Sequence, residues 1–263
     1  MKWLKGLFIN LQFFTSIPIP LALPMDKIHL EKAIRTFPLA GLIQGILYAF
    51  LLYAFLEWTP FSVLAAAFAL WLAGIVLTGG IHLDGWMDAS DAFFSYRDQE
   101  KRLEIMSDPR VGAFGVLSII VLLSVRFLFI YEILLLSRSV TYFFIVLIPF
   151  LSKMLMGVLL INSKAAKKEG LGSLFQQAAS KYTLIIYPVY LLLAAAAAWQ
   201  LGMEAIFGFL AMTIFSILFF IFLSRKIIAW FGGMTGDVLG ASVEGTEVLL
   251  WMILWLLHYF AMG

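Results

Sequence analysis

The feature that most constrains this chain is a series of apolar runs, each about 20 residues long, separated by short polar segments. A helix rises about 1.5 Å per residue, so roughly 20 apolar residues cross the ~30 Å hydrocarbon core of a bilayer. Of the 263 residues, 63% are apolar and 13% charged, whereas soluble domains average about 45–50% apolar and about 25% charged. The pattern therefore predicts an all-α fold, a polytopic integral membrane helical bundle.

The runs predict about seven transmembrane helices. The expected spans are residues 34–56, 61–83, 111–136, 139–161, 182–201, 204–223 and 246–261. Residues 1–263 would then form a single membrane-embedded domain with polar loops at about 84–110, 162–181 and 224–245. Residues 1–17 are expected to form an amphipathic segment at the membrane interface rather than a cleaved signal.

Positive charge is distributed unevenly over these segments. Fifteen of the 18 Lys and Arg residues fall in residues 1–36 and the three loops, and Arg138 alone falls on the opposite side. Cytoplasmic loops of membrane proteins carry an excess of Lys and Arg. The chain is therefore expected in the cell membrane as a multi-pass protein, with its N-terminus and these loops in the cytoplasm.

Three carboxylates follow the second predicted span. Asp84, Asp88 and Asp91 have the spacing i, i+4 and i+7, which places them on one face if the segment is helical. Their helix neighbours are acidic or neutral, so their repulsion is uncompensated unless a cation binds. Oxygen ligands suit a hard cation, and magnesium is typically bound by one or two carboxylates together with substrate phosphates. The triplet predicts a Mg²⁺ site and a phosphate-bearing substrate.

The rest of the 84–110 loop is also rich in charge. Glu104 and Asp108, another i, i+4 pair, could complete the carboxylate site if their segment packs back against the first. The cationic side chains expected to bind phosphate oxygens are Arg97, Lys101, Arg102 and Arg110. The alternative is a solvated helix stabilised by pairs such as Asp98 with Arg102.

A second glycine-rich acidic segment spans residues 232–244 and contains Gly236, Asp237 and Glu244. Its glycines allow close approach of the backbone to a ligand, although small-residue helix packing would account for them equally simply. The two carboxylates in an apolar setting favour a functional role.

Several other polar residues leave two interpretations open. Lys153 lies inside an apolar span, where an ammonium is expensive, so it either pairs with a carboxylate such as Glu132 or faces a cavity that holds phosphate. His82 is either a proton shuttle or a helix-end side chain bonded to backbone. The lysines of the 162–181 loop contact lipid headgroups or attract a nucleotide.

Together these segments resemble the cobalamin synthase family of membrane-bound adenosylcobinamide-GDP ribazoletransferases. The first stretch of resemblance comprises residues 79–85 (GGIHLDG), Asp88, Asp91, 97–98, 101–106 and Asp108, with Arg110, Gly112, Phe114 and Gly115. The second comprises residues 233–237 (GMTGD), Gly240, Ala241 and Glu244.

The resemblance implies a transfer in which adenosylcobinamide-GDP and α-ribazole, or α-ribazole 5′-phosphate, give adenosylcobalamin or its phosphate plus GMP, with Mg²⁺ required. On this reading Asp84, Asp88 and Asp91 are catalytic metal ligands, and Asp108 is the general base or a further ligand. The side chains and backbone expected to bind substrate are His82, Arg97, Lys101, Arg102, Glu104, Arg110, Lys153, Gly236, Asp237 and Glu244.

Two rival functions remain open from the sequence. The Asp88-x-x-Asp91 pair followed by Arg97 faintly resembles CDP-alcohol phosphotransferases, which join an alcohol to a phosphate. A cation-coupled transporter is the second rival, although transporters tend to place ligands at the bilayer midplane and to show paired halves. Membrane lipid is an expected partner and nucleic acid is not, while homo-oligomerisation is left open.

Overall fold

The computed structural model describes residues 2–167 and 169–261, and in this part of the chain the only regular elements are helices. The helices outside the main bundle are α1 (Lys2–Phe14), α2 (Lys27–Arg35), α6 (Gln99–Ile105), α9 (Leu171–Ala178) and the short 3₁₀ turn η1 (Thr183–Ile186). The bundle contains α3 (Phe37–Trp58), α4 (Val63–Thr78), α5 (Ile81–Phe94), α7 (Ala113–Leu135), α8 (Ser139–Asn162), α10 (Tyr187–Leu201), α11 (Met203–Phe231) and α12 (Gly236–Phe260). The predicted all-α class is confirmed.

Six segments of the described chain are long and apolar enough to cross a membrane: α3, α7, α8, η1 with α10, α11 and α12. Helices α4 and α5 give a seventh span if the pair is counted as one, because they pass the same test together but are bent by 86°. The protein is therefore a multi-pass helical membrane protein, in agreement with the prediction of about seven spans.

The bend between α4 and α5 corrects the predicted span 61–83. Gly79 and Gly80 both take left-handed backbone conformations, with φ values of 60° and 76°. Glycine adopts this region readily because it has no Cβ. The chain therefore turns at the glycine pair, and Ile81 starts a new helix that carries the predicted acidic triplet.

The predicted 224–245 loop is also wrong. Helix α11 continues to Phe231 and α12 begins at Gly236, so only residues 232–235 connect them. The charged residues near the end of α11 do not stop it, because long cationic side chains can extend along a helix towards the membrane surface. The helix stops at Gly232, whose φ is 72°, and the last predicted span gains ten residues at its start.

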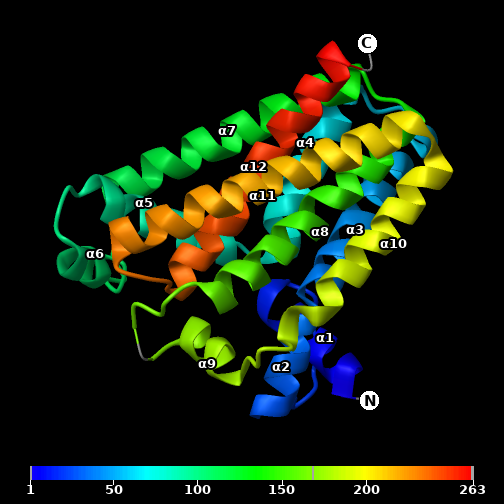
Figure 1. Cartoon of the computed structure of the whole chain (residues 1–263). Helices are drawn as coiled ribbons and strands as arrows, with labels where there is room; N and C mark the ends of the chain where they lie inside the picture. The colour runs from blue at the N-terminus through cyan, green and yellow to red at the C-terminus, as the bar shows by residue number, and fades with distance from the viewer. Residues whose placement is uncertain (1, 168, 262–263) are drawn as a thin grey trace.

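Helix α8 forms the centre of the bundle, between α3, α11 and α12 (Figure 1). The most apolar part of α8 is 83% buried by its neighbours, against 11% for the outer segment that contains α10. Gly41 and Gly45 of α3 allow the close approach to α8, since a Cβ at either position would collide with backbone carbonyls of Pro149 or Val146. The central position of α8 places its polar residues inside the protein.

Helices α5, α6 and α9 and the connection between α11 and α12 lie at one end of the bundle, away from the C-terminus (Figure 1). Two contacts fix this end. The backbone of Met234 exchanges hydrogen bonds with Lys164 O (2.7 Å) and Ala166 N (2.9 Å). Arg102 of α6 donates to Trp230 O at 2.9 Å, which satisfies a carbonyl at the end of α11.

Candidate functional site

The two glycine-rich segments of the sequence meet where α5 packs on α12. A Cβ at Gly85 of α5 would lie 2.7 Å from the carbonyl oxygen of Asp237, and one at Gly240 of α12 would lie 3.3 Å from the Cα of His82. Both glycines therefore allow nearly direct contact between the two backbones. This contact brings the acidic residues of both segments to the same place, although they are about 150 positions apart.

A cavity of about 280 Å³ opens beside this contact. Its walls come from the end of α1, the start of α3, α5, α8, α9, the start of α12, and the loops before α9 and α12. The polar side chains that line it are those of His82, Asp84, Lys167, Glu169, Ser173, Thr235 and Asp237, and Gly236 lines it with backbone. We call this space the acidic cavity. Four of the residues predicted from the sequence line it: His82, Asp84, Gly236 and Asp237.

The predicted triplet of Asp84, Asp88 and Asp91 is helical, and its members have different surroundings. Asp84 lines the acidic cavity. Asp88 is half-buried, and its carboxylate is repelled by those of Asp84, Asp91 and Asp237. Asp91 accepts a hydrogen bond from the backbone N–H of Gly115 at 3.3 Å. Asp88 thus lies within electrostatic reach of three other carboxylates, two on α5 and one on α12.

Asp91 lies against the start of α7. A Cβ at Gly112, the residue before that helix, would overlap the Asp91 carboxylate. A negative charge at the N-terminal turn of a helix is favourable because the turn has free N–H groups and a positive dipole end. Asp91 therefore stabilises the junction of α5 and α7, in addition to its place in the predicted metal triplet.

The donor set suits Mg²⁺ in its chemistry, since every predicted ligand is a carboxylate oxygen. Among the described residues, no three His, Cys, Asp or Glu side chains converge closely enough to hold an ion by themselves. Magnesium usually keeps several waters and takes one or two protein carboxylates with substrate phosphates. Asp84 together with Asp88 or Asp237 would supply the one or two protein carboxylates that Mg²⁺ usually takes.

Lys167 provides positive charge at the acidic cavity. Its side chain lines the cavity, attracts the carboxylate of Asp237 and donates to the hydroxyl of Ser107 at 2.5 Å. From the sequence, the lysines of the 162–181 loop were expected either to contact lipid headgroups or to attract a nucleotide. Its position in the structure favours binding of a phosphate group in the cavity.

The four cationic residues predicted from the 84–110 loop do not line the acidic cavity. Lys101 pairs with Glu104 at 2.5 Å on the exposed face of α6. Arg102 donates a hydrogen bond to the carbonyl of Trp230 at the end of α11, and its guanidinium lies over the ring of Phe93. Arg97 and Arg110 are exposed. The alternative of a solvated, ion-paired helix describes α6 well, except that the pair is not Asp98 with Arg102: Asp98 caps the helix through Lys101 N.

Asp108 does not line the acidic cavity and is held by Arg110. The guanidinium donates from Nε at 2.9 Å and from Nη2 at 2.6 Å. These hydrogen bonds lower the pKa of the Asp108 carboxyl to about 2. A carboxylate with such a low pKa is a weak proton acceptor, so the structure argues against Asp108 as the general base. Neither Glu104 nor Asp108 lines the acidic cavity.

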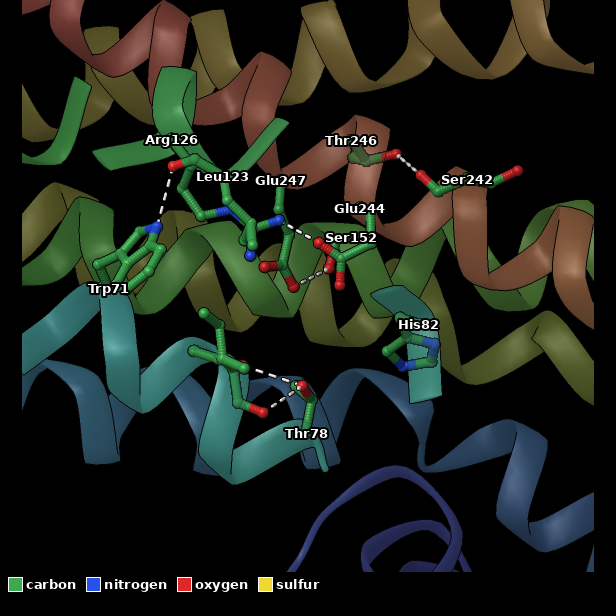
Figure 2. Close-up of polar contacts among 12 residues, drawn as sticks. Trp71, Thr78, His82, Leu123, Arg126, Ser152, Ser242, Glu244, Thr246 and Glu247 are labelled. Carbon is green, nitrogen blue, oxygen red and sulfur yellow. Dashed lines mark hydrogen bonds and ion pairs between the residues drawn. The ribbon is translucent and has the colours of Figure 1, made fainter. Parts of the chain in front are cut away.

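Lys153 and Glu244 lie deeper in the bundle. Glu244 forms an ion pair with Arg126 of α7, and both side chains are buried. Lys153 hydrogen-bonds to Nε2 of His82 and interacts electrostatically with Glu247. The predicted partner Glu132 is therefore wrong for Lys153, and neither Lys153 nor Glu244 lines the acidic cavity. Figure 2 shows Arg126, Glu244 and Glu247 gathered between the helices, with His82 to one side.

Sequence reasoning did not single out Glu247 and Thr235. Glu247 follows Glu244 at i+3 and so shares its helix face, a signal that could have identified it. Thr235 caps α12, accepting from Val238 N at 3.1 Å, and also lines the acidic cavity. Its capping role follows from the sequence, but its place in the cavity depends on tertiary packing.

The fold and the site together define a class: a polytopic helical membrane protein with a cavity at one end of the bundle that is lined by carboxylates and a lysine. The comparisons with known proteins then place it within a family. The family model described as Cobalamin-5-phosphate synthase matches residues 6–255, and the chain belongs to this family.

Curated relatives cover nearly the whole chain. A protein of Geobacillus sp. (strain WCH70), named adenosylcobinamide-GDP ribazoletransferase, is 41% identical over 262 residues, with 98% of both chains covered. Proteins with the same name from Geobacillus thermodenitrificans and Halalkalibacterium halodurans are 42% and 36% identical; the alignments cover 98% and 96% of this chain and 98% and 95% of theirs. No solved structure matches the chain.

Proposed function

We propose that this protein is an adenosylcobinamide-GDP ribazoletransferase, which joins adenosylcobinamide-GDP to α-ribazole or α-ribazole 5′-phosphate and releases GMP. The observation that carries the proposal is the convergence of residues 79–85 and 233–237 on one cavity, in a chain whose curated relatives bear that name over nearly full length. The comparisons support neither a CDP-alcohol phosphotransferase nor a transporter.

The proposed reaction is an in-line displacement at phosphorus. The ribose hydroxyl of α-ribazole attacks the phosphorus that carries cobinamide, the new P–O bond forms, and the bond to the GMP oxygen breaks. Lys167 and the first N–H groups of α12, which line the cavity, are proposed to bind the phosphate oxygens. Asp237, which lines the cavity next to these groups, is the carboxylate proposed to accept the hydroxyl proton.

Mg²⁺ is proposed as the cofactor. Asp84, Asp88 and Asp91 remain the proposed ligands, with Asp84 the one that lines the cavity. When bound with the substrate phosphates, the ion would neutralise charge on their oxygens. The support for this proposal is the repulsion that the carboxylate of Asp88 experiences from those of Asp84, Asp91 and Asp237, for which a cation is the natural counter-charge.

The proposed orientation places the N-terminus and the acidic cavity on the cytoplasmic side. The lysines and arginines of residues 1–36 and of the 84–110 and 162–181 segments support it. Contacts with membrane lipid and formation of a homo-oligomer stay predictions.

The direct test is to incubate the purified protein in detergent or nanodiscs with adenosylcobinamide-GDP, each form of α-ribazole, and Mg²⁺. GMP and the joined corrinoid should appear in equal amounts, and both should disappear with EDTA and return with excess Mg²⁺. Absence of both products with verified folded protein would overturn the assignment, and CDP-alcohol substrates would then be tested.

A further inference from the structure

Five charged or polar side chains form a buried cluster next to the acidic cavity. Arg126 of α7 is paired with Glu244 of α12, Ser152 of α8 donates to Glu247 Oε1 at 3.1 Å, and Lys153 lies within the electrostatic reach of both carboxylates. All five residues are less than 5% exposed. We call Arg126, Ser152, Lys153, Glu244 and Glu247 the buried charge cluster; Figure 2 labels Arg126, Ser152, Glu244 and Glu247.

The charges in this cluster balance, because two cations face two carboxylates. An unpaired ammonium in the interior of a helical bundle is strongly unfavourable, whereas a paired one is tolerated. The pairing fixes Lys153 inside the bundle, 2% exposed, and keeps its ammonium out of the acidic cavity. Lys153 therefore does not touch a substrate in that cavity directly.

Lys153 is connected to the cavity through His82, which is one of the lining residues. The Lys153 Nζ hydrogen-bonds to Nε2 of His82. An ammonium has three donors and no acceptor, so Nε2 must accept, and the neutral imidazole carries its proton on Nδ1. Within the described part of the chain, Nδ1 of His82 has no hydrogen-bond partner. The Lys153 contact thus leaves one free ring N–H donor on a residue that lines the acidic cavity.

The ring of His82 is held in place on its other side. It stacks on Phe14 of α1, with ring centroids 5.5 Å apart and an interplanar angle of 19°. His82 also lies where Gly240 of α12 meets α5, so its backbone is fixed by close packing. A donor held on three sides is preorganised for a ligand and needs little rearrangement.

We propose that His82 donates Nδ1–H to a phosphate oxygen of the substrate in the acidic cavity, and that Lys153 is a positioning residue that sets the tautomer of His82. The buried charge cluster holds the Lys153 ammonium where this contact requires it. The inference rests on the proposed function and deepens it: it separates the residue that touches the substrate from the buried lysine that acts through it.

The test is a double-mutant cycle on transferase activity with His82→Ala, Lys153→Met and the double variant. Loss of one preorganised donor lowers kcat by about 10²–10³-fold in well-studied cases, and we expect an effect approaching this range for His82→Ala. Lys153→Met should lower kcat by a similar or smaller factor. The double variant should be no worse than His82→Ala, because Lys153 acts only through His82.

Two rescue variants distinguish positioning from a purely structural role. In His82→Asn, the amide nitrogen replaces Nδ1–H at nearly the same place and should recover much of the kcat lost in His82→Ala. Lys153→Gln keeps a side-chain N–H that can donate to Nε2 and should retain more activity than Lys153→Met. Ser216→Ala is the matched control, since Ser216 is a buried polar residue that bonds only within its own helix.

Independent, additive losses in the double variant would overturn the proposal, as would an Asn variant no better than Ala. Folding is checked for each variant by size-exclusion profile and thermal melting, and if Lys153→Met does not fold, the Asn–Ala and Gln comparisons decide the question. An inactive wild-type protein would overturn the proposed function instead. The two failures are therefore distinguishable.

Discussion

Gly85 of α5 lies directly against the backbone of Asp237 at the start of α12. A methyl group at Gly85 would stand 2.7 Å from the Asp237 carbonyl oxygen and 3.0 Å from its Cα. The side chain of Asp84, the residue before Gly85, lines the acidic cavity together with that of Asp237. Backbone contact between two helices is therefore what brings the first acidic segment to the second.

Gly85→Ala is expected to damage the site by separating these helices. Both clashing atoms belong to the backbone and cannot rotate away, and overpacking of this kind typically costs about 1–3 kcal/mol. Transferase activity should fall at least tenfold, with a lower melting temperature. Gly74→Ala in α4 is the control: its Cβ would meet the Tyr48 hydroxyl at an ordinary 3.5 Å, and alanine favours helix by about 0.5–1 kcal/mol over glycine. Equal activity of Gly85→Ala and wild type would contradict the close-packing argument.

Asp84→Asn is expected to abolish transfer while leaving membrane insertion and folding intact. The amide is nearly isosteric with the carboxylate but carries no charge, so it is a poor magnesium ligand. Activity should be measured across a Mg²⁺ titration. Lys101→Gln, which removes a charge from the exposed face of α6, should leave activity near wild type. Normal activity of Asp84→Asn at ordinary Mg²⁺ would remove Asp84 from the proposed ligands.

Asp108→Asn should leave the shape of the pH–rate profile unchanged between about pH 5 and 9. The hydrogen bonds and charge of Arg110 lower the pKa of Asp108 to about 2, so the carboxylate is already ionised throughout this range and gains a proton only as pH falls towards that value. Because the shapes of the two profiles are compared, a substitution that alters the loop and changes the rate equally at every pH does not affect the result. Loss of an acidic limb in the variant would reinstate Asp108 as the general base.

Removal of one member of the Arg126–Glu244 pair should destabilise the bundle strongly. Breaking a buried ion pair leaves an uncompensated charge and typically costs about 3–5 kcal/mol, whereas replacing both partners by apolar groups is often neutral. Arg126→Met should therefore lower the melting temperature in detergent more than the double variant Arg126→Met with Glu244→Leu. If the double variant melted below the single one, the pair would not be the source of the stability.

Local patterns were enough to predict the helices and the acidic face of α5. The lengths of the apolar runs predicted the spans 34–56, 111–136, 139–161 and 182–201 to within three residues, whereas α11 and α12 extend well beyond their predicted bounds. The spacing of Asp84, Asp88 and Asp91 predicted one helix face. The bend at Gly79 and Gly80 could not be predicted from hydrophobicity, because the sequence stays apolar on both sides of the two glycines that form the turn. The start of α12 differs from the prediction because clustered glycine and acidic residues are typical of loops, whereas here they form the first turns of a helix.

The partners of the buried residues could not be predicted, because they depend on which helices are neighbours. Lys153 in α8 was expected to need a partner, but its contacts with His82 and Glu247 come from α5 and α12. The positive charge of Lys101 and Arg102 predicts binding of phosphate, but Lys101 pairs with Glu104 within α6 and Arg102 donates to the carbonyl of Trp230 at the end of α11. Charge indicated that these residues mattered, and packing decided what they contact.

The proposed orientation can be tested with single cysteines, because the chain contains none. Glu100 of α6 and Ser137, between α7 and α8, are both exposed and lie on either side of α7, which is long and apolar enough to span the membrane. Excess Lys and Arg beside α6 predicts the cytoplasm for that end. In intact cells a membrane-impermeant maleimide should label Ser137→Cys, and it should label Glu100→Cys only after permeabilisation. The reverse pattern would place the acidic cavity outside the cytoplasm, where a nucleotide-linked substrate made inside the cell could not reach it without transport.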